Sequence, residues 1–276
     1  MVDETRGGGD RPDTVEFRIL GPIQVWAGGR ARPAGEPRQR AVLAALLINV
    51  GRVVSVETLV DRVWGDAPPM RARRSLQAHI ARVRRILDDV AGSSWTRPRV
   101  VREPGGYVVA ATEDQVDALR FRRLVAQARR PDVPESTRAW RLREALDLWR
   151  GEPLAGIPGA WATRIRCALR QDHIDATVAW ARAEIRLGNA DAMVWPLTDL
   201  ADEFPAQEVL AATLMTALYA VGRTTDALGR YEQTRALLRE EFGADPGPEL
   251  RAVHRGVLRH ALAGIGRQPD QGRAPR

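Results

Sequence analysis

The pattern of apolar residues changes character once along this 276-residue chain, near Ala111. Before that point strand signals and helix signals follow one another, whereas beyond it only helical periodicity remains. At roughly 100 to 200 residues per domain, the length allows two domains. We therefore expect a mixed domain over residues 15–111 and an all-helical domain over residues 112–263. Residues 1–14 and 264–276 lack apolar periodicity, which predicts a disordered arm and a disordered tail.

The first domain shows the element order of a known DNA-binding architecture. Alternation between Phe17 and Trp26, followed by Gly28-Gly29, predicts two short strands joined by a hairpin. Three amphipathic segments follow, and Ser55 stands where it can cap the second of them. The turn at residues 103–106 then separates two strand-like segments, which predicts a second hairpin. Strands, three helices and a hairpin together predict a winged helix-turn-helix; the expected helices cover residues 38–49, 56–64 and 70–88.

The third of these helices carries a basic face opposite a narrow apolar stripe. At about 100° per residue, Leu76, Ile80, Val83 and Leu87 form the stripe. Alanines on the opposite face would let the backbone approach base edges in a major groove, where arginine pairs with guanine and glutamine with adenine. We expect Gln77 and Arg82 to read bases, with Ala78 allowing the approach, and phosphate contacts from three further arginines, Arg74, Arg84 and Arg85.

Charge is concentrated in the same region. The chain has a formal net charge of +7, of which residues 1–111 hold +6. Residues 71–102 alone carry nine arginines against two acidic residues. A run of arginines is often only a solvent-exposed surface that binds nothing. Here, however, the run coincides with the third helix and with a hairpin that carries Arg99 and Arg102. A polyanion, double-stranded DNA, is the partner that this distribution favours.

The second domain shows a helical repeat. Gly188-Asn189 and Gly222-Arg223 punctuate corresponding helix ends 34 residues apart, which is the period of a tetratricopeptide helix pair. We therefore expect tetratricopeptide-like helical hairpins, with an irregular helical bundle as the alternative. Either arrangement would serve protein contacts rather than chemistry.

Composition argues against several other classes of protein. All 42 basic residues are arginine, so a phosphate-loop lysine, a Schiff-base lysine and a kinase lysine are excluded. One cysteine and four scattered histidines show no metal-ligand spacing, and acidic pairs such as Asp88-Asp89 have no nucleophile pattern beside them. We expect no enzyme activity, no cofactor and no metal. No apolar run reaches the roughly 18 residues of a membrane span, so we expect a cytoplasmic protein without membrane contact.

Several motifs together resemble one family, the Streptomyces antibiotic regulatory proteins (SARP). These are activators with an OmpR-like DNA-binding domain and a bacterial transcriptional activation domain, and the resemblance covers nearly all of the expected folded chain. The motifs are FRILGP (17–22), RQRAVLA (38–44), LVDRVWG (59–65), SLQAHIARVRRIL (75–87), ALDLWRG (145–151), LMTALYAVGR (214–223) and EFGADPGPEL (241–250).

The resemblance implies an activator of secondary-metabolite genes. Such a protein would bind direct repeats near the promoter −35 region, pair as a homodimer on DNA, recruit RNA polymerase holoenzyme through its sigma factor and act at the nucleoid. By the family's pattern, Gln77, Ala78 and Arg82 would face bases, whereas Ser75, Arg84 and Arg85 would contact the DNA backbone. The Tyr107 hairpin would enter the minor groove, although Glu103 at its turn departs from the family's pattern.

Two alternatives to an activator stay open on the sequence. A DNA-binding repressor would share every residue of the first domain, because the sign of regulation depends on promoter geometry. A helical-repeat adaptor without DNA binding would share every residue of the second.

Overall fold

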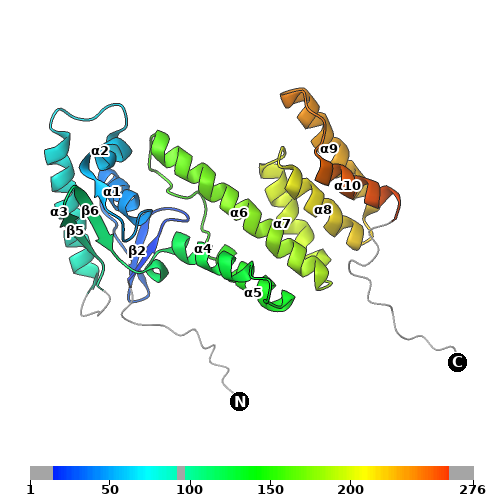
Figure 1. The fold of residues 1–276 in the computed structure, drawn as a ribbon, viewed down its shortest axis with the longest axis horizontal. Helices are drawn as coiled ribbons and strands as arrows, with labels where there is room; N and C mark the ends of the chain where they lie inside the picture. Colours follow the sequence, from blue (N-terminus) through cyan, green and yellow to red (C-terminus); the bar gives the residue numbers. More distant parts are fainter. Residues whose placement is uncertain (1–14, 92–96, 261–276) are drawn as a thin grey trace, which may run out of the picture. The chain divides into compact units, whose positions relative to one another are not determined.

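The computed structural model describes residues 15–91 and 97–260. The predicted arm at 1–14 and the predicted tail at 264–276 lie outside the described residues, as do residues 92–96 and 261–263. The fold is mainly helical: a winged-helix domain with two small antiparallel sheets comes first and helices alone follow, as predicted (Figure 1).

The first sheet is a three-stranded meander in the order β1-β2-β3. Its strands are β1 (Glu16–Arg18), β2 (Gln24–Ala27) and β3 (Arg30–Arg32). The prediction of two strands missed β3, which has no buried residue and therefore leaves no apolar alternation to detect. Phe17 and Val25 pair across β1 and β2 and are both fully buried, so they anchor the sheet in the core.

Three helices and a hairpin complete the winged helix. The helices are α1 (Pro37–Leu47), α2 (Val56–Trp64) and α3 (Ala72–Ala91), and the second sheet has the order β4-β6-β5 with β4 (Val54–Ser55), β5 (Arg99–Glu103) and β6 (Gly106–Ala110). Ser55 caps α2 as predicted, because its Oγ accepts a hydrogen bond from the Thr58 N–H at 3.0 Å. Gly106 lies directly against the Val54 carbonyl, and a Cβ there would collide with that oxygen. The β4–β6 pairing therefore requires glycine at this position.

The part of the described chain that follows the second hairpin is helical. Its helices are α4 (Asp117–Ala128), α5 (Glu135–Leu146), α6 (Ala160–Arg186), α7 (Ala190–Glu203), α8 (Glu208–Ala220), α9 (Thr224–Phe242) and α10 (Pro248–Leu258), with the short 3₁₀ turn η1 (Glu113–Gln115) before them. The turns after α6 and α8 share one hydrogen-bond pattern: Asn189 N–H donates to Glu184 O, and Arg223 N–H donates to Leu218 O. Each turn places a glycine at positive φ, 89° at Gly188 and 82° at Gly222. The 34-residue spacing thus corresponds to a repeated helix end.

Contacts divide the chain into two compact units. The first runs to Arg123 and also includes Asp147–Arg170; the second comprises Leu124–Leu146 and the residues from Gln171 onward. The first unit therefore extends past Ala111, where the sequence pattern changes. The reason is that residues 150–155 pair with the chain between β1 and β2: Arg150 N–H donates to Leu20 O at 2.8 Å, and Leu154 N–H donates to Ile19 O at 3.0 Å.

Candidate nucleic-acid interface

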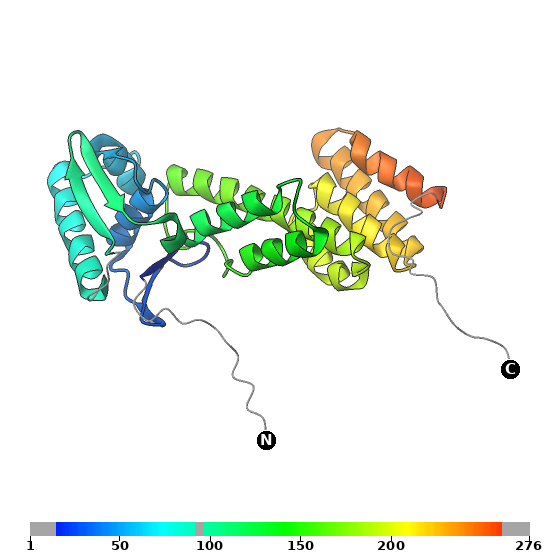
Figure 2. The ribbon, with the colours of Figure 1, turned by 60° about the horizontal axis from the view of Figure 1, so that its bottom comes forward.

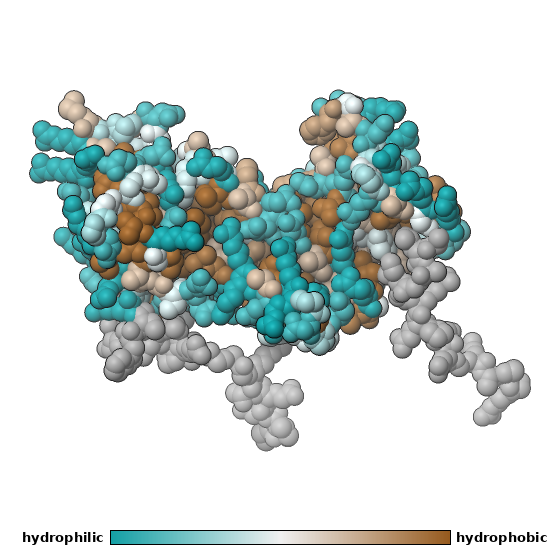
Figure 3. Space-filling model, in the orientation of Figure 1, coloured by the Kyte–Doolittle hydropathy of each residue, from teal (hydrophilic) through white to brown (hydrophobic). Residues whose placement is uncertain are grey.

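One face of α3 is open to solvent over its whole described length. The apolar stripe is buried as predicted, with Leu76, Ile80, Val83 and Leu87 each at most 1% exposed. The opposite face consists of exposed side chains: Arg74, Gln77, Ala78, Ala81, Arg82 and Arg85. In the space-filling view the outer edge of the molecule at α3 is mainly hydrophilic (Figure 3). Five of the predicted contact residues, namely Arg74, Gln77, Ala78, Arg82 and Arg85, therefore share one accessible surface on a single helix.

The helix is fixed from behind by its neighbours. It packs against α1, α2 and β5, and the hairpin β5–β6 lies beside it in both views (Figure 2). The half-buried Arg84 donates its Nε–H to the Val100 carbonyl at 2.8 Å and so ties α3 to β5. At the other end, the exposed Arg73 pairs with Glu57 of α2 at 2.7 Å. A surface held in this way meets a ligand with little loss of conformational freedom.

The position of Arg84 changes its predicted role. Its Nε–H is committed to a backbone carbonyl, so the side chain links α3 to the hairpin, and the phosphate contact expected from the sequence stays a prediction for its remaining N–H groups. Ser75 is half-buried one turn into α3. Its hydroxyl remains a candidate for a backbone contact.

The arginines of the hairpin are exposed, whereas its tyrosine is buried. Arg99 and Arg102 on β5 are exposed, as is Glu103 at the turn. Tyr107 on β6 is only 4% exposed, and the Arg102 guanidinium lies 5.9 Å from its ring centre. The ring belongs to the core beneath the hairpin in this conformation, so little of Tyr107 is accessible to DNA, and the predicted contact stays a prediction. Arg99 and Arg102 are the hairpin groups that can reach a phosphate.

His79 lies on the flank of α3 against the end of α2. Its ring centre is 5.9 Å from that of Trp64, and its buried Nδ1 has no hydrogen-bond partner among the described residues. Burial lowers the pKa of His79, and the positive charges of Arg82 and Arg38 lower it further. The neutral ring is therefore favoured, and it packs as an aromatic group behind the basic face.

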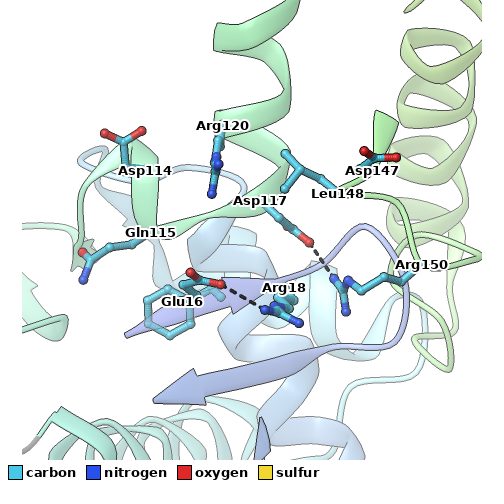
Figure 4. A pocket seen from close by; sticks show the side chains of 10 residues that line it. Glu16, Arg18, Asp114, Gln115, Asp117, Arg120, Asp147, Leu148 and Arg150 are labelled. Atoms are coloured by element: carbon cyan, nitrogen blue, oxygen red, sulfur yellow. Dashed lines mark hydrogen bonds and ion pairs between the residues drawn. The ribbon is translucent and has the colours of Figure 1, made fainter. Parts of the chain in front are cut away.

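A second polar cluster, absent from the sequence-based predictions, lies at the start of α4. Asp117 is buried, with 7% of the residue exposed. Its carboxylate accepts hydrogen bonds from the N–H groups of Ile19 and Leu20 at 2.8 to 3.0 Å. Arg150 donates to the same carboxylate at 2.6 Å (Figure 4). The partners are separated by 33 to 98 residues in sequence, so no local motif could reveal them. The cluster lines a cavity of about 220 Å³ but its buried acid is fully used in structural hydrogen bonds.

Two further features, a metal centre and a membrane span, can be checked against the described residues. In 15–91 and 97–260, no three histidine, cysteine, aspartate or glutamate side chains come together as metal ligands would. Over the same part of the chain, none of the helices combines the length and the apolar character of a membrane span.

This fold and exposed basic helix define a winged-helix regulator with a helical second part. Two family models match accordingly: "Transcriptional regulatory protein, C terminal" over residues 31–108 and "Bacterial transcriptional activator domain" over residues 116–258. The chain belongs to the SARP family of bacterial transcriptional regulators.

Similarity to curated proteins extends over most of the chain. It is 34% identical to "Regulatory protein AfsR" of Streptomyces griseus, over 90% of this chain and 25% of that protein. It is 35% identical to "Transcriptional regulator RedD" of Streptomyces coelicolor, over 88% of this chain and 70% of that one, and 32% identical to MoaR1 of Mycobacterium tuberculosis, over 89% and 79%. The chain thus spans a quarter of the length of AfsR but most of RedD and MoaR1.

One solved structure has the same architecture. "Mycobacterium tuberculosis EmbR in complex with low affinity phosphopeptide" matches with a TM-score of 0.80 and 34% identity, covering 89% of this chain and 65% of that one.

Proposed function

We propose that this chain is a sequence-specific DNA-binding activator of secondary-metabolite genes. The observation that carries the proposal is the exposed face of α3, where arginines and a glutamine alternate with alanines. Alanine leaves space for the backbone to approach base edges, and the neighbouring Gln77 and Arg82 have the donor patterns that read adenine and guanine. Arg74, Arg85, Arg99 and Arg102 supply phosphate contacts on either side.

The second part of the proposal concerns assembly. In this proposal two copies bind direct repeats near the −35 region, and the helical part contacts RNA polymerase holoenzyme, including its sigma factor. The charge distribution supports this division, because the residues after Ala111 hold only +1 of the +7 net charge and gain little from phosphate. The protein would act on the nucleoid, in the cytoplasm.

The experiment has two stages. Selection from random duplexes with the full chain should enrich a repeated half-site, with the two copies in the same orientation. The enriched site is then placed upstream of a reporter promoter, and output is compared with the protein present and absent. Increased output that Arg82→Ala abolishes supports an activator. Decreased output would make the protein a repressor, and failure to enrich any sequence would leave the adaptor alternative as the better description.

A further inference from the structure

A cavity of about 340 Å³ lies within the first compact unit, between the end of α2 and the start of α6. Three arginines line it, Arg38, Arg62 and Arg164. They come from α1, α2 and α6, so the fold brings together cations that are up to 126 residues apart in sequence.

Two of the three arginines are fixed in place. Arg38 donates to the Val63 carbonyl, and its guanidinium lies 5.9 Å from the ring centre of Trp64. Arg62 donates to the Ala45 carbonyl at 3.2 Å, and its guanidinium lies 5.4 Å from the ring centre of Trp161, which is 5% exposed. Each guanidinium has five N–H donors, so both keep donors for another acceptor. Their positions are set before any ligand arrives.

The charges around the cavity are not balanced. Burial lowers the pKa of Arg62, and the neighbouring positive charge of Arg164 lowers it further, whereas Asp61 raises it. Asp61 and Asp66 also line the cavity, which leaves one net positive charge. Within residues 15–91 and 97–260, none of the three arginines forms an ion pair with a carboxylate. Two guanidinium groups that repel each other across a cavity are stabilised by an anion between them.

We propose that this cavity binds the phosphate group of a small molecule through Arg38, Arg62 and Arg164. Arginine presents paired N–H donors that match phosphate oxygens, and the first turn of the 27-residue helix α6 adds positive potential at the cavity edge. The volume lies at the lower end of the range for small-molecule pockets, about 300 to 1,000 Å³. It exceeds the size of phosphate alone, so the rest of the ligand contacts the apolar lining at Val63, Ala67 and Pro158.

The cavity is connected to the recognition helix by one side chain. Trp64 lines the cavity, and its ring centre lies 5.9 Å from that of His79 on α3. Arg38, on the cavity side, and Arg82, on the DNA side, both act electrostatically on His79. A bound phosphate would therefore change the potential at the back of the helix that presents Arg82.

The test is calorimetric titration of the full chain, without DNA, with inorganic phosphate and then with ribose 5-phosphate; ribose is the control for the phosphate group. The main variant is Arg164→Gln, because this exposed side chain has no partner in the described residues and its loss leaves the fold intact. The matched control is Arg251→Gln, which removes the same charge from an exposed position on α10 that does not line the cavity.

We expect saturable binding of both phosphates, no binding of ribose, and affinity about tenfold weaker in Arg164→Gln but unchanged in Arg251→Gln. The absence of saturable binding, or an equal loss in both variants, would overturn the proposal. The phosphate could instead come from the DNA backbone, and a gel-shift series tests this. If Arg164→Gln weakens duplex binding and its salt dependence as much as Arg85→Ala does, the cavity binds a DNA backbone phosphate and the small-molecule assignment is wrong. Because the titration contains no DNA, its result is independent of the proposed regulatory function.

Discussion

Arg84 of α3 donates its Nε–H to the carbonyl oxygen of Val100 on the hairpin, at 2.8 Å. The sequence places Arg84 in a run of arginines with nothing to distinguish it from Arg82 and Arg85. In the structure Arg84 is half-buried and its two neighbours are exposed. The run therefore combines one structural arginine with two that are free to meet a ligand.

The first prediction follows from this difference. Arg84→Ala should lower the free energy of unfolding by about 1 kcal/mol, because the Val100 carbonyl loses its charged donor. Arg85→Ala, at an exposed position, should change stability by less than about 0.5 kcal/mol. Urea unfolding of the two variants and the parent measures both values. Equal stability losses would show that the Arg84 hydrogen bond contributes nothing particular.

The second prediction separates base reading from positioning. Arg82→Ala should cost on the order of 1 to 3 kcal/mol in binding to the selected site and relax the preference at one base pair. Arg85→Ala should weaken binding to all sequences about equally, as expected for a phosphate contact. Gel-shift titrations against the selected site and its single-base variants measure both effects. An Arg82→Ala protein with unchanged affinity and preference would place the docking face elsewhere.

The third prediction concerns salt. If the exposed arginines of α3 and the hairpin neutralise about five to eight phosphates per copy, log K against log salt should fall with a slope of roughly −5 to −7. Arg102→Gln should make that slope less steep by about one, whereas Tyr107→Phe should leave it unchanged because the ring is buried. Fluorescence anisotropy at several salt concentrations gives the slopes. A flat response would contradict the nucleic-acid interface as a whole.

The fourth prediction tests the buried cluster of the first unit. Asp117→Asn should lower the free energy of unfolding by about 3 kcal/mol, since it leaves Arg150 without its charged partner and weakens the hydrogen bonds from Ile19 and Leu20. Asp114→Asn is the control, because Asp114 is an exposed partner of Arg123. Comparable losses in the two variants would mean that the Asp117 cluster is not a stabilising contact.

The same cluster limits any fragment that ends at Ala111. Such a fragment contains the three helices and both sheets but lacks Asp117 and Arg150. It would expose the fully buried Ile19 and Leu20 together with their unpaired backbone groups. A division of labour between the two parts is therefore better tested by point variants of the full chain.

How far the sequence predicts the structure depends on how local the determining contacts are. The cap at Ser55 and the turns at Gly188 and Gly222 each act within a few residues, and the sequence indicates them correctly. The amphipathic stripe of α3 is equally local, so its buried and exposed faces are predicted residue by residue. Strand β3 is missed because an exposed edge needs no apolar pattern.

The same distinction between local and long-range contacts applies to the predicted contact residues. Exposure of Gln77 and Arg82 follows from helical periodicity alone. The roles of Arg84 and Tyr107 depend on how β5 and β6 pack against α3, which no spacing within the sequence encodes. The three arginines of the α2–α6 cavity are likewise assembled only by the fold.

The fifth prediction is a pH dependence of stability that originates in the second unit. Burial lowers the pKa of His173 on α6 to about 4, from an ordinary value of 6.5. The unfolded chain therefore binds a proton below pH 6.5 that the folded chain takes up only near pH 4, so acid favours unfolding across this window. The free energy of unfolding should fall by about 3 kcal/mol from this group between pH 7 and pH 4. His173→Gln should reduce that fall. Urea titrations at half-unit pH intervals give the comparison, and parallel pH profiles for the parent and His173→Gln would show that His173 is protonated as readily in the folded chain as in the unfolded one.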